Sequence, residues 1–167
     1  MYNTTMIVAA VFIGLALVLF ALSFFSKRRF GILGLALTAG ATLSAIWGDT
    51  ADLVISATGL VPTGTLTSAI ALSLVTLLPA IVLLFHGYRY KDIFSRSVGS
   101  LFFTVLALTF LLEPVAHALP LEGASAYWYN QALSYKDLII SAGVVLAVLD
   151  LFFTKSKHTS EKDSKKK

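Results

Sequence analysis

Residues Ser26 to Trp47 read SKRRFGILGLALTAGATLSAIW, and this stretch decides the fold of the chain. Its first four residues form a basic turn between two apolar runs. The remainder, from Phe30 to Trp47, is long enough for a short transmembrane helix, which needs roughly 17 to 25 residues. Clustered cations stay on the cytoplasmic side of a membrane. The turn therefore predicts that the helices on both sides of it have their basic ends in the cytoplasm.

Small residues recur at four-residue spacing along the predicted helix 30–47. The two rows contain Gly34, Thr38 and Thr42 in the first, and Ala36, Gly40 and Ser44 in the second. Such rows let helix backbones approach closely, and helices in hydrocarbon associate through packing because lipid is as apolar as they are. The sequence therefore predicts that the other helices pack around this one, with Gly34, Thr38, Gly40, Thr42 and Ser44 as packing positions.

The composition indicates an integral membrane protein. Hydrophobic residues make up 57% of the 167 residues and charged residues 13%, against roughly 25% charged in a typical soluble domain. The mean hydropathy is +0.83. The chain has no cysteine, which excludes disulfides, thiolate metal sites and cysteine nucleophiles. Its length predicts a single domain.

Five apolar runs predict an all-α bundle of five transmembrane helices in residues 1–153. The spans are about 6–25, 30–47, 66–85, 98–119 and 138–153. Residues 49–65 are too short to span, and we interpret them as an outer loop packed on the bundle; the alternative is a short amphipathic helix in the membrane interface. Residues 154–167 are rich in Lys and Ser and are predicted to form a basic, disordered cytoplasmic tail.

The distribution of cations predicts the orientation. Of thirteen Lys and Arg residues, three lie in the first short loop, three in the second and six in the tail, so that only Lys136 lies on the opposite side. This bias places the N-terminus outside and the C-terminus in the cytoplasm. The predicted topology anchors or lipid head-group contacts are Lys27, Arg28, Arg29, Arg89, Lys91 and Arg96.

Glu113 and His117 lie near the outer end of the fourth predicted span, and both are candidates for an ion or proton path. They are four residues apart and therefore share a helix face. The alternative, which we favour, places them at the outer interface, paired with each other or with water. In that case Pro114 belongs to a loop or a first turn and the helix ends at Leu112.

Asp150 is the third candidate for an ion or proton path, and it lies in the last apolar run. Its carboxylate would then face the Ser and Thr rows of the second helix. The alternative, which we favour, is an ion pair with Lys155 or Lys157 at the inner interface.

The motifs of common enzymes are missing from the sequence. It contains no phosphate-binding glycine loop, no HExxH metal motif and no GxSxG nucleophile elbow. We therefore predict no enzymatic activity, no cofactor and no metal. The second basic loop, residues 86–97, interleaves cations with aromatic residues, and between two spans this pattern favours an anionic lipid surface over nucleic acid.

The order of these features resembles the colicin V production protein family of bacterial inner-membrane proteins. Arg28-Arg29-Phe30-Gly31 leads into the small-residue-rich helix that ends at Trp47, and the later segment FSRSVGSLF, residues 94–102, opens a further helix. The resemblance covers roughly residues 10–113. It implies a small protein of four or five spans with an accessory role in colicin export, biofilm formation or envelope homeostasis.

We therefore predict a non-enzymatic multi-pass protein of the bacterial cytoplasmic membrane, acting as an accessory or scaffold in export or envelope processes. Its expected partners are the lipid bilayer and either further copies of itself or other membrane proteins. One alternative is a small transporter or channel subunit that uses Glu113, His117 and Asp150. Another is a structural subunit of a larger membrane complex.

Overall fold

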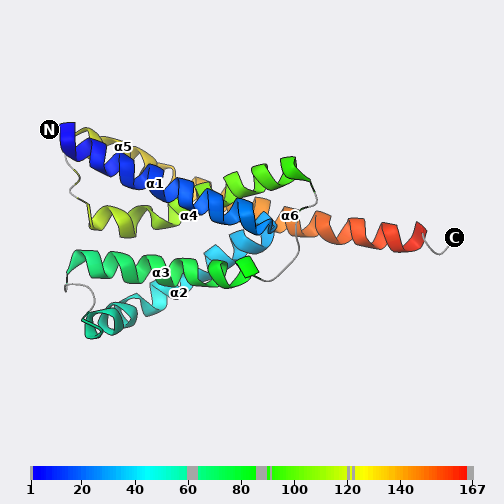
Figure 1. The fold of residues 1–167 in the computed structure, drawn as a ribbon, viewed down its shortest axis with the longest axis horizontal. Helices are drawn as coiled ribbons and strands as arrows, with labels where there is room; N and C mark the ends of the chain where they lie inside the picture. Colours follow the sequence, from blue (N-terminus) through cyan, green and yellow to red (C-terminus); the bar gives the residue numbers. More distant parts are fainter. Residues whose placement is uncertain are drawn as a thin grey trace.

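The computed structural model describes residues 2–59, 64–85, 90, 92–119, 121 and 123–164, and within these ranges the only regular elements are helices (Figure 1). Six helices follow one another: α1 (Tyr2–Ser26), α2 (Phe30–Ala57), α3 (Thr65–Phe85), α4 (Ile93–His117), α5 (Ala124–Ser134) and α6 (Lys136–Ser164). The predicted all-α bundle is confirmed.

Four of the helices, α1 to α4, are long and apolar enough to cross a membrane. Helix α5 and the part of α6 up to Phe152 pass the same test together, although the chain bends by 46° between them. The protein is therefore a multi-pass helical membrane protein with four or five candidate spans.

The helices differ from the predicted spans mainly at their ends. Helix α2 continues to Ala57, so the segment interpreted as an outer loop begins as helix, in line with the alternative. Helix α4 continues through Pro114 to His117 and does not end at Leu112. A proline is tolerated there because it removes only one backbone hydrogen bond.

The tail also differs from its prediction. Helix α6 runs to Ser164, so most of the segment predicted to be disordered is helical. Residues 144–167 contain neither glycine nor proline, and lysine and glutamate are good helix formers. A helix that begins in the bundle can therefore continue into this polar segment without an apolar face.

The bundle has two chemically different ends (Figure 1). The C-terminal ends of α1 and α3 and the N-terminal ends of α2 and α4 meet at one end, beyond which α6 projects. We call it the basic end, because the Lys27–Arg29 turn lies there. The N-terminal ends of α1 and α3 and the C-terminal end of α2 lie at the opposite end, which we call the distal end.

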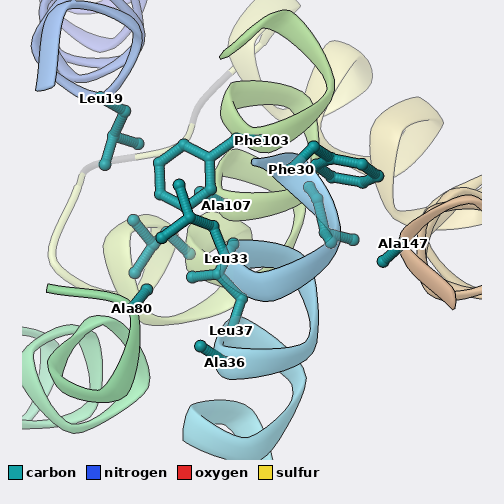
Figure 2. Close-up of a cluster of buried hydrophobic side chains, with 11 residues drawn as sticks. Leu19, Phe30, Leu33, Ala36, Leu37, Ala80, Phe103, Ala107 and Ala147 are labelled. Atoms are coloured by element: carbon teal, nitrogen blue, oxygen red, sulfur yellow. The ribbon is translucent and has the colours of Figure 1, made fainter. Parts of the chain in front are cut away.

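Helix α2 packs directly against α3, α4 and α6, so the prediction that the other helices pack around it holds for these three; α1 packs mainly against α4 instead. Leu33 and Leu37 of α2 are completely buried. Figure 2 shows them in a cluster with residues of the four other long helices: Leu19 of α1, Ala80 of α3, Phe103 and Ala107 of α4, and Ala147 of α6.

The small residues of α2 serve contacts within the chain. A Cβ on Gly40 would lie 2.0 Å from the Thr76 carbonyl oxygen of α3. In the same row, the Ser44 hydroxyl donates to the carbonyl of Leu72, 3.4 Å away. The row of Gly34, Thr38 and Thr42 is only partly used for packing: Gly34 meets α6, whereas Thr42 is exposed.

Thr38 and Thr42 do not bond to a neighbouring helix through their hydroxyl groups. The Thr38 hydroxyl donates to the Gly34 carbonyl and the Thr42 hydroxyl to the Thr38 carbonyl, each at 3.0 Å and within α2. The packing surface of α2 therefore follows its glycines and Ser44, while the threonines satisfy themselves locally.

Candidate functional site

Arg28 lies at the C-terminal end of α3. The last carbonyl groups of a helix have no partner within it, and a cation is favoured beside them. The Arg28 guanidinium is buried there: its Nε donates to the Leu84 carbonyl at 3.0 Å, and a second nitrogen donates to the carbonyl of Phe85. The residue predicted to anchor the topology thus joins the α1–α2 turn to the end of α3.

Arg96 serves the C-terminal end of α1 in the same way. Its Nε donates to the Phe24 carbonyl, and its guanidinium carbon lies 3.7 Å from the centre of the Phe24 ring. Just beyond, Lys27 has a φ of 59°, the left-handed backbone that ends many helices. The Lys27 carbonyl accepts a hydrogen bond from the Tyr90 backbone N–H at 2.8 Å. Contacts from α4 and from the α3–α4 connection therefore hold this turn.

Asp150 of α6 serves the N-terminal end of α2. Helix α2 has no cap from its own N-cap side chain, that of Arg29. One Asp150 oxygen instead accepts the Gly31 N–H at 2.9 Å, and the other lies 3.9 Å from the Arg29 guanidinium. The approach depends on glycine, because a Cβ on Gly31 would lie 2.6 Å from the Ala147 carbonyl of α6. An anion at a helix N-terminus is electrostatically favoured.

Tyr90 completes this group from the α3–α4 connection. Its hydroxyl accepts the Phe30 N–H at 3.1 Å and is hydrogen-bonded to Asp150, while Arg29 lies over its ring, 5.4 Å from the centroid. A Cβ on Gly99 would lie 2.6 Å from the hydroxyl oxygen. Burial raises the pKa of Tyr90, and the Asp150 carboxylate adds to this effect. The neutral hydroxyl can therefore act as donor and acceptor at once.

Five residues hold the helix ends at the basic end, and we call them the basic cap cluster: Arg28, Arg29, Tyr90, Arg96 and Asp150. Arg29, Tyr90 and Asp150 contact one another, and Arg28 and Arg96 each donate to the end of a helix. The cluster serves the C-terminal ends of α1 and α3 and the N-terminal end of α2. The cations Arg28 and Arg96 lie at C-terminal helix ends and the anion Asp150 at an N-terminal end, as the helix dipole favours; Arg29, the N-cap residue of α2, is the exception and lies beside Asp150. The cluster therefore closes the basic end of the bundle electrostatically.

At the distal end, Glu113 of α4 forms an ion pair with Lys136, the first residue of α6. Their side-chain atoms are 2.7 Å apart, and the Glu113 side chain is 46% exposed. His117 does not pair with the Glu113 carboxylate; its Nδ1 lies 2.8 Å from the Glu113 backbone oxygen. Of the two partners predicted for these residues, each other or water, the first does not hold for the Glu113 carboxylate, because Lys136 occupies that position.

Asp52 of α2 is a second polar contact at the distal end. One of its carboxylate oxygens accepts a hydrogen bond from the Ser68 hydroxyl, 3.0 Å away in the first turns of α3. The other oxygen is buried without a hydrogen-bond partner among the described residues. The position near the start of α3 again suits an anion.

The two groups of charges are separated by an apolar core. Lys136 and Asp150 lie fourteen residues apart on α6, which corresponds to roughly 21 Å of helix. The core between them contains Leu33, Leu106 and Leu111, all essentially inaccessible. Thr104 and Thr109 are buried in α4, but each hydroxyl donates to a carbonyl of its own helix at 2.8 Å. These two hydroxyl groups therefore have their partners within their own helix.

The structure therefore brings together part of the predicted set. Arg28, Arg29, Arg96 and Asp150 all lie at the basic end, where Arg29 is the arginine beside Asp150, whereas Glu113 and His117 lie at the distal end. Asp150 contacts Arg29 and Gly31, and its predicted pairing with Lys155 or Lys157 falls on side chains outside the described part of the chain. Arg89 and Lys91 lie outside the described residues, and Lys27 is exposed.

Sequence reasoning missed Tyr90 and Gly31 as partners of Asp150, and Lys136 as the partner of Glu113. The signal for Lys136 was its position as the single cation on the predicted outer side. No comparable signal marks Tyr90, because interfacial tyrosines are common in membrane proteins. Among the described residues, no three His, Asp or Glu side chains are grouped as a metal site would require.

We compared the chain with known protein families, curated proteins and solved structures. No protein-family model, no curated protein and no solved structure matches the chain.

Proposed function

We propose that this chain is a non-enzymatic accessory or scaffold protein of the bacterial cytoplasmic membrane, acting in export or envelope processes. The observation that carries the proposal is the use of charge: the ionisable side chains that contact the bundle serve helix ends or pair between helices. Such contacts fix a framework of helices. The resemblance to the colicin V production protein family supports the export or envelope context.

Transport by a path through Glu113, His117 and Asp150 has less support. Intramembrane ionisable residues that move ions or protons face a cavity or form a chain of polar groups. Here Asp150 is engaged at the start of α2, and the Glu113–Lys136 pair lies roughly 21 Å away along α6. The apolar core between them weighs against a relay.

The framework also explains how such a protein would act on partners. Many large apolar side chains on α1 point outward, among them Met6, Ile13 and Leu17, each more than 60% exposed. In a bilayer these faces meet lipid or the apolar faces of other membrane proteins. A rigid bundle with fixed apolar faces is suited to hold other chains in place.

The test combines the mass of the native particle with a flux assay. The chain is extracted from its own membrane into lipid nanodiscs, weighed, and its co-purifying chains are identified. A discrete assembly with other membrane proteins supports the proposal. A lone chain that conducts ions in proteoliposomes, and loses conduction in Glu113→Gln, would contradict it.

The matched control for this substitution is Asp92→Asn. Asp92 is exposed, and although it is the N-cap residue of α4, its side chain makes no cap hydrogen bond. The control therefore removes one acidic charge at the basic end without breaking a cap. If both variants keep the native assembly and neither changes flux, Glu113 acts structurally.

A further inference from the structure

The last ten residues of α2, 48–57, have an unusual distribution of side chains, and we call them the α2 foot. Leu53 is 71% exposed and Val54 61% exposed. Asp52 and Ser56 are partly buried instead, with Asp52 bonded to Ser68 of α3. A surface helix in water shows the opposite pattern, with its apolar stripe inside. The exposed face of the foot therefore matches an apolar environment.

This face follows helical spacing. Thr50, Leu53, Val54 and Ala57 lie three or four residues apart and are all exposed. The same face continues backward to the exposed side chains of Leu43, Ile46 and Trp47, and all of α2 from Phe30 to Ala57 forms one candidate membrane span by length and composition. The apolar face of the foot is therefore continuous with the lipid-facing surface of α2.

The foot is too far along the helix to lie in the hydrocarbon core. Helix α2 has 28 residues, so it is about 42 Å long, whereas the hydrocarbon core is about 30 Å thick. Asp49 is exposed at the start of the foot, and an unpaired carboxylate is costly inside hydrocarbon. The membrane boundary therefore lies close to Trp47 and Asp49.

The direction of the foot agrees with a position along this boundary. Figure 1 shows the last turns of α2 nearly end-on, although its earlier turns run along the bundle. Two contacts fix this position: a Cβ on Gly48 would meet the Leu72 side chain at 2.5 Å, and Asp52 is bonded to Ser68. The foot therefore turns across the distal end of the bundle.

The polar side chains lie along one flank of the foot. Asp49, Asp52 and Ser56 are three and four residues apart, beside the exposed apolar face. A helix with adjacent polar and apolar faces lies in the plane of the interface, with its apolar face sunk roughly 5–10 Å into the head-group and acyl boundary. A lipid leaflet fits both faces of the foot at once.

We propose that the α2 foot is an interfacial lipid-binding segment, with Leu53 and Val54 inserted among the acyl chains of the leaflet at the distal end. The occupant of this face is lipid, because the face continues the lipid-facing surface of α2 without interruption. The binding is independent of the proposed scaffold role.

The test uses spin labels on single cysteines, which the cysteine-free chain permits. Leu53→Cys and Val54→Cys are labelled and reconstituted in vesicles of phosphatidylcholine and phosphatidylglycerol. Collision with oxygen, which enters lipid, is compared with collision with a water-soluble nickel chelate. Leu43→Cys is the reference within the membrane, and Thr58→Cys is the exposed reference just beyond the foot.

We expect the oxygen-to-nickel ratio at positions 53 and 54 to exceed that at 58 several-fold and to approach that at 43. A ratio at both positions equal to that at 58 would overturn the proposal, because the foot would then lie in water. Labels shielded from both reagents, with dipolar broadening between copies, would overturn it in favour of a second chain. The two sites are exposed, so labelling either one disturbs no contact within the bundle.

Discussion

Both ends of the bundle are held by charged side chains, but Arg28 at the basic end is buried, whereas Glu113 at the distal end is partly exposed. At the basic end, Arg28 is 8% exposed and belongs to a cluster of five residues that serves three helix ends. At the distal end, Glu113 is 46% exposed and has one partner, Lys136. A buried cation is costly to leave unpaired or to replace, whereas an exposed ion pair contributes little. We therefore expect stability to depend on the basic end far more than on the distal end.

The largest effect is expected between the two ends, where α2 crosses α3. Gly40→Leu places side-chain atoms where the Thr76 backbone lies, and a backbone cannot move aside as a flexible side chain can. We expect a loss of more than about 3 kcal/mol, the upper range for overpacked cores, seen as loss of the monodisperse peak in detergent. The control is Gly14→Leu, which meets nothing within 4 Å. Equal behaviour of the two variants would contradict this packing.

At the basic end, Arg28→Gln removes the donors of the α3 C-terminal carbonyls. Hydrogen bonds from charged groups contribute about 1.5–3 kcal/mol each, so we expect the free energy of unfolding to fall by about 2–4 kcal/mol. The measurement is an SDS unfolding titration. Lys27→Gln is the neighbouring control, since Lys27 is exposed. A loss in Arg28→Gln no larger than in Lys27→Gln would show that the guanidinium does not cap α3.

Asp150→Ala tests the other partner of the cluster. It removes the acceptor for the Gly31 N–H and the anion beside Arg29. Loss of an N-terminal cap costs roughly 0.5–2 kcal/mol, and the same titration measures it. Asp137→Ala is the control on the same helix, where the exposed Asp137 lies in the first turn of α6. If Asp150→Ala costs no more than this control, α2 does not depend on a cap from α6.

The smallest effect is expected at the distal end. Glu113→Gln breaks an ion pair that is exposed on one side, and such pairs contribute about 0.2–1 kcal/mol. The loss should shrink further in high salt, because screening weakens exposed pairs. A loss as large as that of Arg28→Gln, and insensitive to salt, would remove the difference between the two ends.

Much of the fold was predictable because hydrocarbon leaves a chain few choices. A long apolar run must form a helix in lipid, since every backbone polar group needs a partner within the segment. The close approach of α2 to α3 also followed from its small residues, because Gly40 and Ser44 both meet α3. The prediction that every helix packs around α2 went too far, since α1 packs mainly against α4. Small residues alone do not identify packing positions, as Thr42 shows, because a threonine hydroxyl can bond within its own helix.

The candidate site was less predictable, because each charge finds its partner across the bundle. The Asp150 carboxylate meets Gly31, which lies 119 residues away in the sequence and which no local rule would select. His117 is near Glu113 in sequence, but Lys136 reaches the carboxylate. The Asp150 contact depends on how closely α2 and α6 approach, which Gly31 permits at the contact itself.

The most direct test of the basic cap cluster is a double-mutant cycle between Tyr90 and Asp150, measured as the free energy of unfolding in SDS. The two side chains come from the α3–α4 connection and from α6, and they bond at the start of α2. Residues in one hydrogen-bond network show coupling energies of about 0.5–3 kcal/mol, whereas independent sites add within about 0.3–0.5 kcal/mol. The cluster predicts that Tyr90→Phe and Asp150→Ala are coupled by about 0.5 kcal/mol or more. Additive losses would contradict a connected cluster that holds the helix ends together.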